Sequence, residues 1–139
     1  MSKAIEKRRI LLQQLNDVVA HLRDTYQNIP DPEIMVYELW TAKDILSHLT
    51  FWHESFARNV RDLACDVKPT PLRGKLSDLN QYGVDNMKPH ALEVIMARLE
   101  TAQKTISDHI LNTKIVMIPY RRGSRDYTPE EHLEIVINH

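Results

Sequence analysis

The stretch WTAKDILSHLTFWH, residues 40–53, marks the beginning of a long amphipathic helix. Thr41 and Asp44 stand three residues apart, the spacing of a capping box with Asp in place of the usual Glu or Gln. Apolar residues then recur every three or four positions, which is the period of one helix face. They form the stripe Ile45, Leu49, Trp52, Phe56, Val60 and Leu63. The pattern predicts a helix over residues 42–65 and sets His48 on its apolar face.

Helix signals also lie on both sides of this stretch. The same apolar period predicts a helix over residues 3–27, which the prolines of NIPDPE (residues 28–33) bring to an end. A connector with two prolines and a glycine follows the central helix, and residues 77–88 are ambiguous between a short helix and more connector. Another long apolar stripe predicts a helix over residues 90–112.

The last predicted helix, over residues 128–139, is short. Thr128 is a good N-cap, Pro129 suits the first helical position and Glu131 completes a capping box. The segment before it contains KIVMIPY, which has strand character but no partner strand, and a loop is expected there. The prediction is an all-α protein, a four-helix bundle whose last helix covers about half the length of the others. Either a partner chain closes the bundle or the chain is a truncated form of a longer one, and truncation is favoured.

Composition points to one ordinary globular domain over residues 1–139. The chain has 42% hydrophobic residues, and its 18 Lys and Arg against 19 Asp and Glu give a net charge of −1. Such a balance provides no strong field for nucleic acid or an anionic membrane, and no apolar run reaches the length of a membrane span. Cys65 is the single cysteine, so no intrachain disulfide forms. A cytoplasmic protein with no nucleic-acid or membrane partner is expected.

The seven histidines are the main candidates for a functional site. A buried imidazole needs partners for its nitrogens, so His48 is either a packed core histidine or a metal ligand, and spacing leaves the two readings about even. His132 and His139 share a face of the last helix, but at seven residues apart they do not converge on one ion. His109 suits the negative end of its helix. Surface or boundary positions are expected for His21, His53 and His90.

The residues Trp40, Thr41, Asp44, Ile45, Leu46, His48, Leu49 and Trp52 resemble the second-helix signature of the DinB/YfiT-like superfamily. Residues 79–102 resemble its linker and third helix, in particular in the ClbS/DfsB branch, and residues 127–139 resemble the approach to its last helix. The similarity covers essentially the whole chain. It implies an up-down-down-up four-helix bundle.

The resemblance also implies a site. Many members hold a divalent metal, zinc or nickel, with one histidine from the second helix and two from a His-x-x-x-His motif on the fourth. His48 matches the first of these ligands and His139 the second, while the position four residues later lies beyond residue 139. Ile135 stands where some relatives carry a ligating Glu. The implied activity is that of a metal-dependent hydrolase, or a thiol-dependent transferase or isomerase, acting on a small molecule.

Two further expectations concern substrate and partners. Arg121, Arg122 and Arg125 precede the last helix and are the best candidates for holding a carboxylate of the substrate, although a solvated loop is the more ordinary role for exposed arginines. Cys65 is expected to be a packing residue and not a nucleophile. A short last helix would leave apolar surface uncovered, so a homodimer is expected. The alternative function is a non-catalytic bundle, stabilised by dimerisation, with His48 packed in its core.

Overall fold

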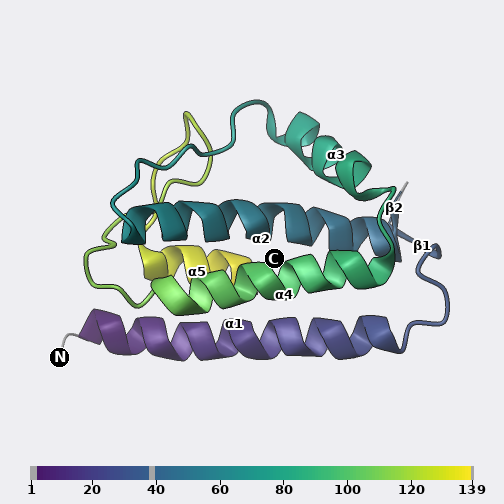
Figure 1. The fold of residues 1–139 in the computed structure, drawn as a ribbon, viewed down its shortest axis with the longest axis horizontal. Helices are drawn as coiled ribbons and strands as arrows, with labels where there is room; N and C mark the ends of the chain where they lie inside the picture. Colours follow the sequence, from purple (N-terminus) through teal and green to yellow (C-terminus); the bar gives the residue numbers. More distant parts are fainter. Residues whose placement is uncertain (1–2, 38–39, 139) are drawn as a thin grey trace.

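The computed structural model describes residues 3–37 and 40–138, and this part of the chain is mostly helical with one small two-stranded sheet (Figure 1). The elements are α1 (Lys3–Gln27), β1 (Met35–Tyr37), β2 (Trp40–Thr41), α2 (Ala42–Ala64), α3 (Leu76–Met87), α4 (Leu92–His109) and α5 (Pro129–Ile137). None of the helices in the described ranges is long and apolar enough to cross a membrane.

Local capping explains where two of these helices begin. In α2 the hydroxyl of Thr41 accepts a hydrogen bond from the Asp44 amide at 3.0 Å, and the Asp44 carboxylate accepts one from the Thr41 amide at 3.1 Å. Thr128 and Glu131 make the same reciprocal pair at the beginning of α5. Both capping boxes are confirmed, because each satisfies two amides that the first helical turn leaves without a backbone partner.

The predicted helix bounds differ from the observed ones in the third long helix. The helices predicted over 3–27 and 42–65 are confirmed to within one residue, whereas α4 begins two residues later and ends three residues earlier than the range 90–112. The ambiguous stretch 77–88 forms α3. The KIVMIPY segment is a loop, as expected, although one bridge pairs Ile118 with Tyr127.

Sequence patterning missed the hairpin that precedes α2. β1 pairs with β2 in antiparallel register, with Met35 opposite Thr41. The backbone amide of Ala42 also donates to the Ile34 carbonyl at 2.9 Å, so the hairpin is joined directly to the first turn of α2. These strands have too few residues for a recognisable alternation of apolar and polar side chains.

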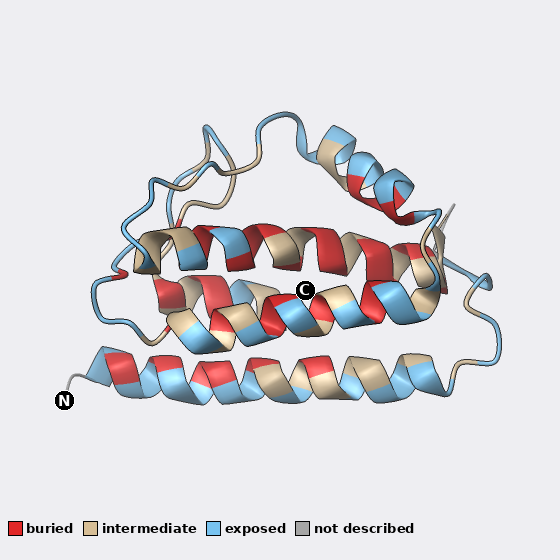
Figure 2. Cartoon of the chain, in the orientation of Figure 1, coloured by how far each residue is buried: buried red, intermediate tan, exposed pale blue. Residues whose placement is uncertain are grey.

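The core lies where α2 packs on α4 and α1 packs on α5, while α3 covers the outer side of α2 (Figures 1 and 2). Because α2 is covered on two sides, its buried residues do not follow the predicted stripe. Ile45 and Leu49 are only half-buried, and Leu46 is fully buried. Phe51 is also buried, because Gly83 of α3 lies directly against its ring.

A buried arginine near the beginning of α1 contacts the beginning of α5 and the end of α4. The side chain of Arg8 in α1 donates to the carboxylate of Glu130 in α5 at 3.0 Å and to the carbonyl of Ile110, just after α4, at 2.9 Å. It also reaches the carbonyl of Asn112 at 3.3 Å. The Arg8 side chain is 8% exposed, so its charge depends on these partners and not on water.

Candidate functional site

A cavity of about 400 Å³ lies among α1, α2, α4, α5 and the loop that precedes α5. Its wall is formed mostly by aliphatic side chains of the four helices. The lining residues with polar side-chain atoms are Asp17, His21, Trp52, His53, Tyr120 and His132. A cavity of this size, mainly apolar with a few polar groups, has the character of a small-molecule site.

His132 is the polar group of α5 in this wall. It is 3% exposed, and its ring stacks on Phe56 with the centroids 3.9 Å apart. Burial, with a smaller contribution from the neighbouring His53, lowers the pKa of His132 to about 4. Its Nδ1 is buried and has no hydrogen-bond partner among the described residues. The imidazole is therefore neutral at pH 7, with a nitrogen available to take up a proton.

His53 of α2 is the second buried imidazole, which contradicts its expected surface or boundary position. It is 5% exposed, and its Nε2 lies 2.7 Å from Oε1 of Gln103. The amide nitrogen of Gln103 donates to Asn16 at 2.6 Å, so its oxygen is the group that accepts from His53. This arrangement holds the tautomer with the proton on Nε2. Burial lowers the pKa of His53, and the hydrogen bond to Gln103 partly opposes that effect.

Tyr120 and Trp52 form an aromatic part of the wall. Their rings are stacked, with the centroids 5.2 Å apart and an interplanar angle of 10°. The indole Nε1 of Trp52 also donates a hydrogen bond to Asn80 of α3 at 2.7 Å, which fixes the orientation of the ring. Burial raises the pKa of the Tyr120 hydroxyl and Tyr127 raises it further, while Arg121 opposes both. The phenol of Tyr120 therefore stays protonated at neutral pH.

Of the two predicted metal ligands, only His48 belongs to the described part of the chain. His48 is half-buried and its ring lies 5.1 Å from that of Trp40, at the hairpin end of α2. It is not part of the cavity wall. His139 lies outside the described residues, so the predicted contact between His48 and His139 stays a prediction. In the described ranges, no three His, Cys, Asp or Glu side chains are placed to hold a metal ion together.

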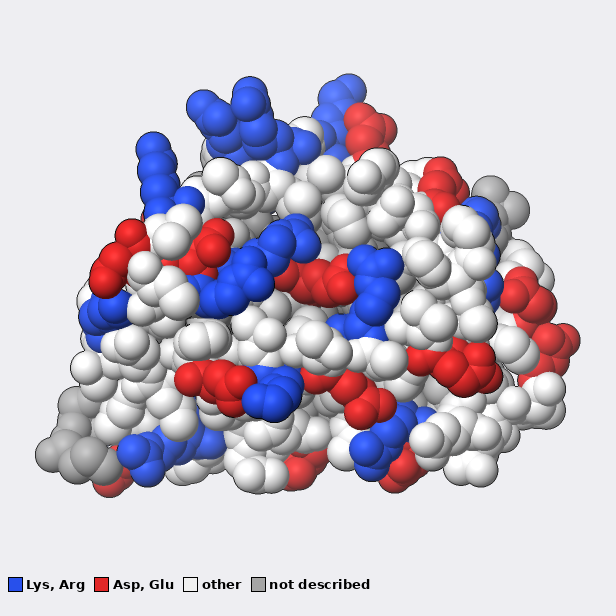
Figure 3. Space-filling view, viewed as in Figure 1, with Lys and Arg blue, Asp and Glu red and all other residues white. Residues whose placement is uncertain are grey.

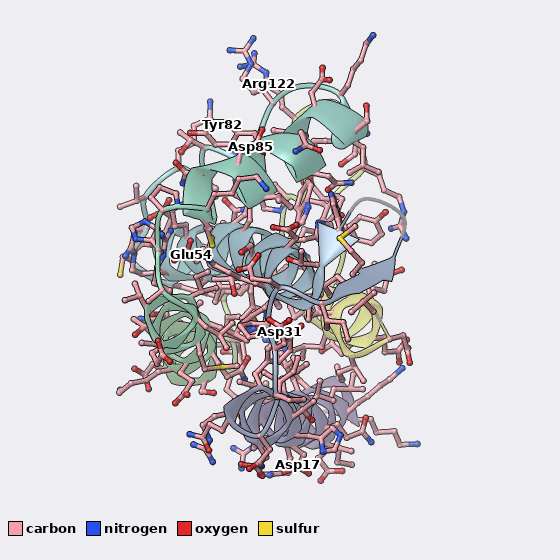
Figure 4. The ribbon with its side chains drawn as sticks, turned by 90° about the vertical axis from the view of Figure 1, so that its right-hand side faces the viewer. Asp17, Asp31, Glu54, Tyr82, Asp85 and Arg122 are labelled. Atoms are coloured by element: carbon pink, nitrogen blue, oxygen red, sulfur yellow. The ribbon has the colours of Figure 1, made fainter. Side chains whose placement is uncertain are left out.

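The three predicted substrate-binding arginines lie in the loop before α5 but outside the cavity wall. Arg121 donates to the Gly74 carbonyl at 2.9 Å, and Arg125 pairs with Glu131 at 3.2 Å. Arg122 is exposed. Figure 3 shows Lys and Arg side chains along the upper edge of the molecule, and Figure 4 shows Arg122 on the side opposite to Asp17 of the cavity wall. Two of the three guanidinium groups are thus occupied by the protein itself.

Sequence reasoning missed His53, although a signal for it exists. A second stripe runs along α2 at spacings of four and three residues, through Leu46, Thr50, His53, Ala57 and Val60. All five of these residues are buried. Because several members of this second stripe are small or polar, the stripe is less conspicuous in the sequence than the more hydrophobic one.

Comparison with protein-family models, with curated proteins and with solved structures finds no match to this chain.

Proposed function

We propose that this chain is a small-molecule enzyme of the DinB/YfiT-like type, in which His132 accepts a proton and Tyr120 donates one. The observation that carries the proposal is the wall they share: a neutral imidazole and a protonated phenol line one apolar cavity, with their ring centroids 5.8 Å apart. At neutral pH the two groups hold the protonation states that a base and an acid need, because the imidazole is neutral and the phenol keeps its proton.

The arrangement of the helices supports the DinB-like part of the proposal. In Figure 1, α1 and α5 run in one direction while α2 and α4 run in the other, and these directions support the up-down-down-up order that the resemblance implies. Figure 4 looks along these helices, with α2 between α4 and α5 and with α1 across the molecule from α3. The Trp40-to-Trp52 segment, which carries the resemblance, supplies one wall of the cavity through Leu49 and Trp52.

The reaction that fits these groups best is hydrolytic opening of a reactive ring. His132 takes a proton from a water molecule as the water oxygen bonds to a ring carbon. The bond from that carbon to the ring heteroatom breaks, and Tyr120 gives its proton to the leaving heteroatom. The product is the substrate plus one water, and a proton returned from His132 to Tyr120 through solvent restores both groups. General acid and base assistance of this kind contributes roughly 10²–10⁴-fold to a rate.

A divalent metal, zinc or nickel, is a separate proposal that rests on the resemblance. The described residues do not fit it, because His48 packs beside Trp40 and has no two further ligating side chains around it. A metal would act as a Lewis acid or lower the pKa of a bound water. Metal analysis of the purified protein before and after incubation with zinc and nickel, compared with His48→Ala, tests this proposal independently of the His132 chemistry.

The test of the catalytic proposal measures hydrolysis of styrene oxide, cyclohexene oxide and δ-valerolactone by product chromatography. His132→Gln and Tyr120→Phe are each expected to lower the rate of the best substrate by about 10²-fold or more. Tyr82→Phe is the matched control, because Tyr82 lies on α3, is 60% exposed and is not part of the wall. Rates that do not depend on His132 for any of the three compounds contradict the proposal.

The competing function is a non-catalytic bundle stabilised by dimerisation. Ile135 supports it, because this cavity-lining side chain of α5 is 39% exposed and would be covered by a second copy. Sedimentation that shows a dimer, together with no His132-dependent turnover, would favour this alternative.

A further inference from the structure

Among the described residues that line the cavity there is no lysine and no arginine. The two buried histidines of the cavity wall are held neutral by desolvation. The one carboxylate, Asp17, belongs to the exposed side of α1 and accepts a hydrogen bond from Gln13 at 3.0 Å. A ligand entering this cavity therefore meets neutral buried groups, and at its exposed edge it meets the carboxylate of Asp17 and the ring of His21.

An anionic ligand would lose hydration in this cavity without gaining a charged partner. Transfer of a carboxylate into apolar surroundings is strongly unfavourable unless it is paired and hydrogen-bonded. Arg121, which directly follows Tyr120 of the cavity wall, donates a hydrogen bond to the Gly74 carbonyl, and Arg125 is paired with Glu131. These two guanidinium groups are thus bound outside the cavity, and a carboxylate inside it would have no arginine or lysine among the described lining residues as a partner.

The polar groups that remain favour an oxygen on the ligand. Tyr120 keeps its hydroxyl proton and so offers a hydrogen-bond donor, and the unpaired Nδ1 of His132 leaves that buried ring short of a partner. The flat surface of Trp52 stacked on Tyr120 and the aliphatic side chains around it suit a compact carbon skeleton. A volume of about 400 Å³ limits this skeleton to a small molecule.

We infer that this cavity takes an uncharged, mainly apolar molecule with an acceptor oxygen, and that it rejects a carboxylate of the same shape. The inference deepens the proposed function by defining the class of its substrate, and it rests on that function only in calling the ligand a substrate. The arginines of the loop before α5 are then excluded from holding a substrate carboxylate inside the cavity.

Three rigid molecules of one shape separate charge from size: 1-adamantanemethanol, adamantane-1-carboxylate and 1-adamantanemethylamine. Their binding at pH 7.5 is followed through the backbone amide chemical shifts of the whole protein. The alcohol is expected to bind at least about tenfold more tightly than the carboxylate, with shifts at residues 15–22, 49–53 and 132–136, because these segments line the cavity.

Two charge-matched variants test the cause of the selectivity. Asp17→Asn should strengthen carboxylate binding about threefold, the effect of removing one exposed like charge near the ligand. Glu6→Gln changes the net charge equally but lies outside the cavity wall on the same helix, and should leave carboxylate binding unchanged. Equal effects of the two variants would assign the selectivity to overall charge and overturn the inference.

The remaining outcomes are decisive in the same way. Tightest binding by the carboxylate or by the amine overturns the inference, as does failure of the alcohol to shift the cavity residues at millimolar concentration. If the alcohol is preferred while hydrolysis in the assay above does not depend on His132, the inference holds and the proposed function fails. If hydrolysis depends on His132 but the carboxylate binds best, the proposed function holds and the inference fails.

Discussion

The free energy of unfolding of the wild type should fall as the pH is lowered from 7 to 5, and replacing His132 by Gln should remove much of this loss. The folded-state pKa of His132 is about 4, against 6.5 for an ordinary histidine, so between these values the unfolded chain binds a proton that the folded chain does not. Unfolding free energy therefore rises with pH in this window. The contribution of the neutral His132 to the free energy of unfolding is complete above pH 6.5. It declines as pH falls from 6.5 to 4, and it is lost below that range.

The magnitude follows from the displacement of the pKa. At 1.36 kcal/mol per pKa unit, the whole window corresponds to about 3 kcal/mol, of which about 2 kcal/mol is lost between pH 7 and pH 5. His53 adds to the effect in wild type with the same sign, because burial lowers its pKa as well. The difference between wild type and His132→Gln isolates the part that belongs to His132 and its coupling to His53.

The assay is urea unfolding at pH 7.0, 6.0 and 5.0, followed by helical circular dichroism. Wild type should lose about 2 kcal/mol more than His132→Gln between pH 7 and pH 5. His90→Gln is the control, because His90 lies in the turn before α4 and outside the cavity wall, and it should retain the wild-type pH dependence. Parallel stability curves for wild type and His132→Gln would refute the assignment of His132 as a neutral buried imidazole.

Three further predictions concern stability and assembly. Arg8→Ala should lower the unfolding free energy by about 3 kcal/mol, because it leaves Glu130 and two carbonyls without their partner. Lys7→Ala, which breaks only an exposed pair, should cost about 0–1 kcal/mol in the same urea titration, and equal costs would contradict the role of burial. Gly83→Ala should cost about 1–3 kcal/mol, since the added methyl group would lie 2.5 Å from the Phe51 ring, and additional Phe51→Leu should recover part of that loss. Sedimentation at micromolar concentration should show a homodimer, and a monomer there would contradict the expected association.

Local chemistry made much of the fold predictable from the sequence. The capping boxes at Thr41 and Thr128 act within one helical turn, so the residues that begin α2 and α5 can be recognised without knowledge of their neighbours. The prolines at 30 and 32 likewise end α1 through steric effects on the adjacent residue. The three long helices followed from such signals and from the apolar period.

The site depended on contacts that no local pattern contains. Helical periodicity identifies an apolar face, but which other helices cover it is decided by packing between segments distant in the chain. α2 is covered by both α3 and α4, so its buried surface extends past the predicted stripe and includes His53, whose partner Gln103 is 50 residues away. The neutral state of His132 has the same origin, because Phe56 of α2 stacks on its ring and helps to exclude water. Tertiary packing set these properties because burial and dielectric surroundings belong to the assembled helices and not to any one of them.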